Sequence, residues 1–129
     1  MDTIFEFKIT VTSADIDDLN HVNNVVYVKW MDEVAINHWA FLTVDTPLPE
    51  YIWVVVRHEI DYKSQAFLGD EIIAKTWVGE TKGFTSERLI AFYKKDVLLA
   101  KSKTTWAMLN AQTYKPTRIR EDVLKVLQS

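Results

Sequence analysis

Hydrophobic and polar residues follow two different periods along this chain of 129 residues. Residues 4–12 and several later segments alternate with a period of two, which is typical of a strand with one packed face and one solvated face. The later strands are expected at residues 51–63, 71–78, 84–93 and 97–109.

Residues 24–42 break this alternation and indicate a helix. Their polar residues Lys29, Glu33 and Asn37 recur every four positions and form one narrow stripe, on which Lys29 and Glu33 are placed to pair. Most of the remaining circumference is apolar, and such a helix is usually covered by other structure on most of its sides. A second, short helix is predicted around residues 120–127.

The connections between the later strands are rich in turn-forming residues. Gly69-Asp70, Lys82-Gly83 and Lys94-Lys95-Asp96 each directly precede a predicted strand, which is typical of antiparallel hairpins and short turns. One helix and about five antiparallel strands indicate an α+β fold, in which a curled sheet wraps a long central helix. No repeat, linker or low-complexity tract divides the chain, so we expect one domain over residues 1–129.

The strand expected at residues 84–93 has apolar residues on both faces. Ile90 and Phe92 alternate there with Leu89, Ala91 and Tyr93. A single helix covers only one face of a sheet, so the other face has to be buried against something else. A second copy of the chain is the simplest candidate, and we therefore expect a homodimer or a homotetramer.

Composition excludes several classes of function. A net charge of −3 provides no basic excess for a nucleic-acid partner. The chain has no cysteine, which excludes disulfides and thiol nucleophiles, and its three histidines lack the spacing of metal ligands. No apolar run is long enough to span a membrane, and the first six residues lack the features of a signal peptide. The expected location is the cytoplasm.

The most polar segment lies directly before the predicted helix. Residues 15–24 hold three aspartates, three asparagines and one histidine. Asp and Asn stabilise turns and cap helices. The first free N–H groups of a helix also attract negative charge. The segment therefore has the composition of a site that places an acidic group beside an anion pocket.

This segment also resembles a known signature. It reads Asp15-x-Asp17, then His21-Val22-Asn23-Asn24, then Tyr27. It is similar to the signature of hot-dog-fold acyl-CoA thioesterases, in particular the 4-hydroxybenzoyl-CoA thioesterase-like family. Residues 57–62 and Gly69-Asp70 are similar to that family's second strand and turn. The resemblance implies a hydrolase that cleaves an acyl-CoA thioester with water and requires neither a metal nor a cofactor.

The resemblance assigns roles to two residues of the segment. It makes Asp17 the catalytic carboxylate, acting either as a nucleophile or as a general base for water. It makes the backbone N–H of Asn24 the oxyanion donor, which agrees with its predicted place at the start of a helix. Turn propensity alone instead favours Asp17 as a turn or capping residue.

His21 has two interpretations. Plant acyl-carrier-protein thioesterases share this pattern and use a histidine at this position, whereas the 4-hydroxybenzoyl-CoA type has an apolar residue. The plant pattern also has an asparagine where this chain has Leu19, so its full catalytic set is not present. His21 is therefore a candidate either for catalysis or for fixing the loop.

The same resemblance provides candidate substrate-binding residues, namely Asn23, Tyr27, Lys82 and Phe84. Arg88 is a weaker candidate. Two alternatives to an acyl-CoA hydrolase stay open. One is a hot-dog module that binds or senses acyl-CoA without turnover, and the other is a thioesterase for acyl-carrier protein.

Overall fold

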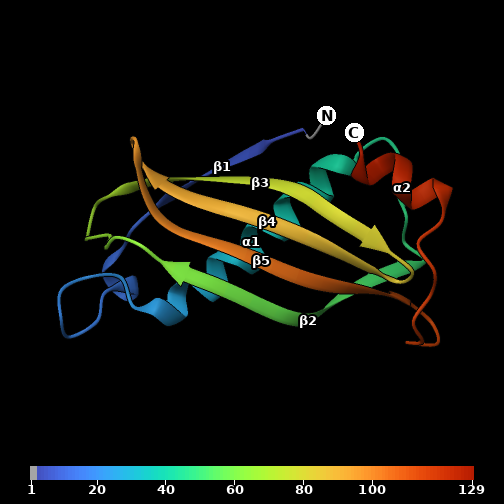
Figure 1. Cartoon of the computed structure of the whole chain (residues 1–129), viewed down its shortest axis with the longest axis horizontal. Helices are drawn as coiled ribbons and strands as arrows, with labels where there is room; N and C mark the ends of the chain where they lie inside the picture. The colour runs from blue at the N-terminus through green and yellow to red at the C-terminus, as the bar shows by residue number, and fades with distance from the viewer. Residues whose placement is uncertain (1–2) are drawn as a thin grey trace.

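A single antiparallel sheet curls around one side of a helix in the computed structural model, which describes residues 3–129 (Figure 1). The strands are β1 (Phe5–Thr10), β2 (Tyr51–Tyr62), β3 (Glu71–Lys82), β4 (Thr85–Lys94) and β5 (Val97–Asn110), in the spatial order β1-β3-β4-β5-β2. The helices are the 3-10 turn η1 (Ser13–Asp15), α1 (Asn24–Leu42) and α2 (Glu121–Leu127). Met1 and Asp2 lie outside the described residues. They belong to the predicted domain and to the N-terminal segment that is predicted to lack a signal peptide.

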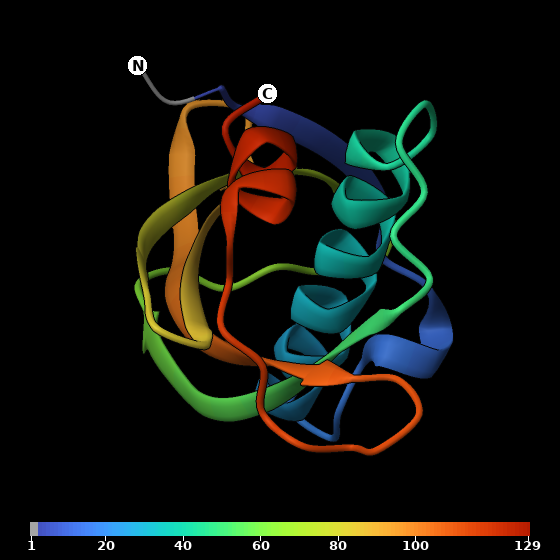
Figure 2. The same cartoon turned by 90° about the vertical axis from the view of Figure 1, so that its right-hand side faces the viewer.

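Helix α1 begins and ends at the predicted residues. Its first turn is capped by Asn23, whose Oδ1 accepts a hydrogen bond from the N–H of Val25 at 3.0 Å. The predicted pair on the solvent side is confirmed, because Lys29 Nζ lies 3.9 Å from Glu33 Oε1. An end-on view shows α1 lying along the inside of the curled sheet (Figure 2), and one face of the helix is buried. That face consists of Tyr27, Trp30, Met31, Val34, Ala35 and His38.

The apolar core has two clusters, one for each half of α1. The first half contributes Trp30 and Met31, which pack with Ile90 and Phe92 of β4. The second half contributes Trp39 to a smaller cluster that includes Met108, Val123 and Leu127. Burial of a side chain as large as that of Phe92 stabilises the fold by about 2–3 kcal/mol. The two ends of α1 are therefore held by separate groups of contacts.

The turn between β3 and β4 differs by a few residues from the prediction. Gly83 and Phe84 form a two-residue turn between the paired residues Lys82 and Thr85, so Phe84 lies outside the strand. Gly83 has φ +64°, a conformation that favours glycine. β3 continues to Lys82, beyond its predicted end at Val78, because an irregularity after Val78 shifts the pairing without ending it.

The two edge strands of the sheet are β1 and β2. On β2, Val54, Val55 and Val56 are 39%, 39% and 60% exposed. An apolar edge strand with unpaired backbone groups is a common place for pairing with another chain. Self-association stays a prediction, and β2 is a candidate surface for it. Within residues 3–129, no helix is long and apolar enough to cross a membrane.

Candidate active site

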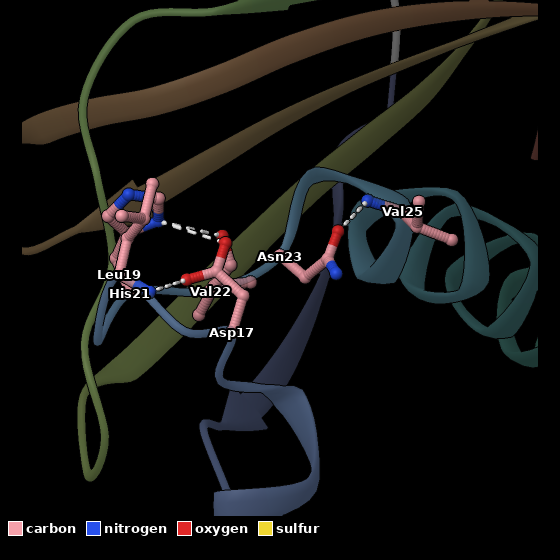
Figure 3. Close-up of polar contacts among 6 residues, drawn as sticks. All are labelled: Asp17, Leu19, His21, Val22, Asn23 and Val25. Atoms are coloured by element: carbon pink, nitrogen blue, oxygen red, sulfur yellow. Dashed lines mark hydrogen bonds and ion pairs between the residues drawn. The ribbon is translucent and has the colours of Figure 1, made fainter.

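The polar segment before α1 forms a tight loop, whose side-chain contacts are drawn in Figure 3. Hydrogen bonds within its own backbone hold this loop together. The N–H of Asp17 donates to the carbonyl oxygen of His21 at 3.0 Å, and the N–H of Asn20 donates to that of Asp17 at 3.1 Å. Asn20 has φ +65°, a left-handed conformation that asparagine tolerates better than most residues. The residue types that predicted a turn thus form one.

Both ends of the loop are tied to neighbouring structure. The N–H of Val22 donates to the carbonyl oxygen of Ala66 at 2.8 Å, and the N–H of Asn23 donates to that of Asp15 at 3.0 Å. The carboxylate of Asp15 accepts from the N–H of Thr12 at 2.9 Å, so Asp15 acts as a capping residue. Because these bonds involve short side chains and backbone, the position of Asp17 depends little on flexible groups.

The two carboxylate oxygens of Asp17 have different surroundings. Oδ1 accepts a hydrogen bond from the N–H of Leu19 at 2.9 Å. Oδ2 lies 3.7 Å from Nδ1 of His21, which is longer than a hydrogen bond. The side chain of Asp17 is 26% exposed. One oxygen therefore fixes the turn and the other stays available, so the structural and catalytic interpretations of Asp17 are compatible.

The ring of His21 lies between two acceptors. Its Nδ1 is 3.7 Å from the Asp17 carboxylate and 3.4 Å from the carbonyl oxygen of Val22. Nδ1 is therefore the ring nitrogen that faces both oxygens. The geometry suits both a residue that orders water and one that only steadies the loop.

The first backbone N–H of α1 has no partner among residues 3–129. The N–H of Val25 is capped by the Asn23 side chain, and the N–H of Val26 donates to the Asn23 carbonyl oxygen at 2.9 Å. The N–H of Asn24 makes no such bond, and Asn24 is exposed. The hydroxyl of Tyr62 donates to the Asn24 carbonyl oxygen at 3.0 Å and fixes the helix start against β2. A fixed, free N–H at this place can bind an anionic oxygen.

Two of the predicted substrate-binding residues have structural roles here. The side-chain oxygen of Asn23 is engaged in the helix cap. Tyr27 is only 2% exposed, and its ring meets those of Trp30, Tyr62 and Phe92 edge-on. Burial, with smaller effects from Tyr62 and Asp70, raises the pKa of Tyr27 to about 12. Tyr27 is therefore a neutral core residue in the same apolar cluster as Val22 of the loop.

The other two, Lys82 and Phe84, lie at the opposite end of the sheet from the loop (Figure 1). β3 starts beside the loop at Glu71 and ends at Lys82, which is roughly 35 Å of extended strand. One chain therefore does not bring Lys82 or Phe84 to Asp17. If Lys82 and Phe84 contact the substrate that binds at Asp17, they have to come from a second copy of the chain.

A buried polar pair was not predicted from the sequence. Arg88 Nη1 lies 2.6 Å from His38 Nδ1 and donates to Thr76 Oγ1 at 3.1 Å. Burial, and then the positive charge of Arg88, lowers the pKa of His38 to about 4, and burial lowers the pKa of Arg88 to about 10. The available signal was that His38 falls at helical spacing with Met31 on the buried face.

No group of three or more metal-ligating side chains gathers anywhere in the part of the chain that the structure describes. The available chemistry is therefore that of one accessible carboxylate oxygen, one histidine ring and one free backbone donor. These three groups come from the loop and the first residue of α1. Together they define a candidate site for attack on a carbonyl group.

A curled five-stranded antiparallel sheet around a helix, with an acidic loop at the helix start, is the arrangement implied by the thioesterase resemblance. The model of the thioesterase-like superfamily matches residues 11–127 of this chain. The chain belongs to this superfamily. The predicted family is thereby confirmed.

Among proteins of known activity, the chain is similar to the chloroplast acyl-[acyl-carrier-protein] hydrolase FATB3 of Cuphea viscosissima. The two are 30% identical over 76 residues, which is 57% of this chain and 18% of that protein. The chain thus spans less than a fifth of the length of this relative.

Solved structures share the fold over almost the whole chain. A predicted thioesterase from Bacillus stearothermophilus has a TM-score of 0.86 at 22% identity, covering 97% of this chain and 94% of that one. The protein SAV2348 from Staphylococcus aureus, solved in complex with CoA, also has a TM-score of 0.86, at 18% identity and with 98% and 82% covered. At these identities the likeness establishes the fold.

Proposed function

We propose that this protein hydrolyses an acyl-CoA thioester to a free acid and CoA. The observation that supports this most directly is the loop before α1. There, the carboxylate of Asp17 keeps one oxygen free of hydrogen bonds to residues 3–129, and the N–H of Asn24 is an unpartnered donor at the helix start. An attacking group and an oxyanion donor are the two elements that acyl transfer requires.

In the proposed reaction, the thioester carbonyl oxygen accepts a hydrogen bond from the N–H of Asn24. Either Asp17 Oδ2 attacks the carbonyl carbon and water then hydrolyses the resulting anhydride, or Asp17 removes a proton from water as the water attacks. Negative charge on the carbonyl oxygen is stabilised by the fixed N–H group. In the nucleophilic route the C–S bond breaks as the anhydride forms, before water attacks it. In the general-base route the C–S bond breaks after water has added to the carbonyl carbon. In both routes the CoA thiolate leaves and takes up a proton.

His21 is the proposed auxiliary residue. Its Nδ1 faces the same carboxylate oxygen at 3.7 Å, which leaves room for the ring to orient a water molecule bound to Asp17. Because a thiolate is a good leaving group, the reaction requires little help from a general acid. We therefore assign His21 a smaller contribution than that of Asp17.

A thioesterase for acyl-carrier protein is the second candidate. The similarity to the plant acyl-[acyl-carrier-protein] hydrolase supports it, whereas the CoA in the complex of the Staphylococcus aureus protein supports an acyl-CoA substrate. A module that only binds or senses acyl-CoA is less well supported, because binding alone does not require the free carboxylate oxygen of Asp17.

We also propose that the protein works as a homodimer or homotetramer paired through β2. Support comes from the exposed Val54, Val55 and Val56 on this edge strand and from Lys82 and Phe84, which reach a thioester at Asp17 only from another copy. Sedimentation at micromolar concentration should show a dimer or a larger species, and Val56→Lys should shift it toward monomer. A well-folded wild-type monomer would contradict this proposal.

The function is tested by measuring thiol release from a series of acyl-CoA substrates of increasing chain length and from the matching acyl-carrier proteins. We expect hydrolysis of at least one acyl-CoA, with Asp17→Asn as the inactive control. Faster hydrolysis of the acyl-carrier-protein substrates would favour the second candidate. Tight binding of acyl-CoA without any release of thiol would show a binding module and refute the enzyme.

A further inference from the structure

A cavity of about 560 Å³ lies at the other end of α1 from the loop. Its wall is mostly apolar and includes Trp39 of α1, Trp53 of β2, Trp106 of β5 and Leu127 of α2. Figure 2 shows α2 and the C-terminal turns of α1 at this same end of the molecule. The volume falls within the range of about 300–1,000 Å³ that small-molecule sites occupy.

The cavity is separate from the candidate active site. Ala35, the first α1 residue of its wall, is about 16 Å along the helix axis from Asn24 at 1.5 Å per residue. The packed side chains of Trp30, Val34 and Phe92 occupy the interior between the two places. A ligand in this cavity therefore contacts a different set of residues.

One residue of the cavity wall is a buried cation. Arg88 is 7% exposed, and its hydrogen bonds to His38 and Thr76 both use Nη1. Its Nε and Nη2 make no hydrogen bond to residues 3–129. Both atoms keep some accessible surface, since neither is fully buried. Arg88 lines the cavity, so these free N–H groups belong to a residue of the cavity wall.

Within residues 3–129, no carboxylate forms an ion pair with Arg88. Glu87 also borders the cavity, but its carboxylate pairs with Lys103 at 3.5 Å. Its side chain points to the opposite face of the sheet, because successive residues of a strand alternate. A buried charge without a counter-ion is unfavourable, so this position is suited to a ligand that brings a negative charge.

The tryptophans of the wall add further unpartnered donors. The indole N–H groups of Trp53 and Trp106 are buried and have no acceptor among residues 3–129. Buried N–H groups usually find a partner, so these two indicate a missing acceptor or a wall that adjusts around one. Both indole N–H groups have almost no accessible surface, so a ligand in the cavity reaches them only if the wall adjusts.

We propose that this cavity binds a monocarboxylic acid with an apolar body. The carboxylate accepts hydrogen bonds from Nε and Nη2 of Arg88, in the fork geometry that matches guanidinium to carboxylate. The apolar body lies among the rings of Trp39, Trp53 and Trp106. This proposal does not rest on thioester hydrolysis, since the acid contacts neither Asp17 nor Asn24.

The probes are octanoate and 2-naphthoate, with 1-octanol as the uncharged control, and binding is measured by calorimetry at pH 7.5. We expect one acid molecule per chain and at least tenfold weaker binding of 1-octanol. Arg88→Met should abolish this preference, whereas Arg57→Met, on the exposed part of β2, should keep it. Asp17→Asn should keep it as well, which separates this site from the active site.

A spectroscopic readout on the wild-type protein avoids any doubt about the folding of Arg88→Met. Octanoate should shift the indole N–H resonance of Trp106, assigned with Trp106→Phe, more than 1-octanol does. The proposal is overturned if 1-octanol binds as tightly as the acids, if neither acid binds, or if folded Arg88→Met retains the preference. Loss of acid binding in Asp17→Asn would also overturn it, because the acid would then be at the active site.

Discussion

The two ends of helix α1 hold their polar groups in opposite ways. At the N-terminal end, the loop around Asp17 is built from neighbouring residues, lies partly open to solvent and is held by backbone hydrogen bonds. At the C-terminal half, Arg88, His38 and Thr76 come from three different elements and are buried together. The first arrangement leaves a carboxylate and a donor accessible, whereas the second keeps a cation away from bulk water.

This difference shows that the same helix supports reactivity at one end and burial at the other. A carboxylate that has to react benefits from a fixed but hydrated position. A cation in an apolar wall is stabilised most by an anionic partner that binds it and excludes water. We therefore expect substitutions at the first end to change turnover with little effect on stability, and substitutions at the second end to change stability or ligand binding.

The largest effect is expected for Asp17→Asn. The amide oxygen can still accept from the N–H of Leu19, so the loop should keep its shape while the charge is lost. We expect turnover of the best acyl-CoA to fall by about a hundredfold or more, with the melting temperature nearly unchanged. The exposed Asp18→Asn is the matched control and should stay active. Comparable activity of Asp17→Asn and wild type would remove Asp17 from the mechanism.

Acidification should affect the buried end next. The pKa of His38 is lowered from 6.5 to about 4, so in this pH window the unfolded chain binds a proton that the folded chain does not. Folding free energy from His38 is therefore fully present above pH 6.5 and is lost as the pH falls toward 4, by at most about 3 kcal/mol. Denaturant unfolding at pH 7.5 and 4.5 measures this loss.

His38→Gln is the control for this prediction, because it has no titrating ring and its amide oxygen can still accept from Arg88. Its stability should fall less between pH 7.5 and 4.5 than that of the wild type. His21 and His58 are present in both proteins, so the comparison isolates the effect of His38. Equal losses in the two proteins would show that the His38 site is not the origin of acid sensitivity.

A smaller effect on stability is expected from the helix caps. Asn23→Ala removes the acceptor for the N–H of Val25 and should lower the free energy of unfolding by about 1 kcal/mol. Turnover should fall as well, since the same cap sets the position of the Asn24 N–H. Thr43→Ala, which removes a hydrogen bond to the Trp39 carbonyl at the other end of α1, should leave turnover unchanged. Thermal unfolding and steady-state kinetics of both variants measure the contrast.

The smallest effect concerns His21. If it orders water beside Asp17, His21→Ala should lower turnover by about tenfold or less and change the shape of the pH–rate profile. If it only steadies the loop, the melting temperature should fall while the profile keeps its shape. Measuring both quantities on both proteins decides between the two. An unchanged profile with full turnover would exclude a catalytic role.

Most of the fold was predictable because its signals are local. The bounds of α1 and the positions of all five strands follow from periodicity and turn residues, and the ends that moved lie at turns or irregularities such as that after Val78. The pairing partners of the edge strands were harder to predict, because β1 pairs with β3 and β2 pairs with β5 across intervening elements. No pattern in a single sequence records such contacts.

The same distinction applies to the candidate sites. Asp17, His21 and Asn24 lie within eight residues of one another, so their contiguity made them visible. Arg88 meets His38 across 50 positions of sequence, and nothing in the spacing marks that pair. Lys82 and Phe84 were named from a family resemblance, and a single chain places them far from the loop.

The order of strands in the sheet also has a consequence for how the chain folds. β3, β4 and β5 form a local meander at the centre, whereas both edge strands pair with partners far away in sequence. Closing long loops is entropically unfavourable and slows folding, so we expect the meander to form early and β1 and β2 to join late. The Asp17 loop follows β1, and Trp53 of the cavity lies on β2. Both candidate sites therefore belong to the segments that are expected to become ordered last.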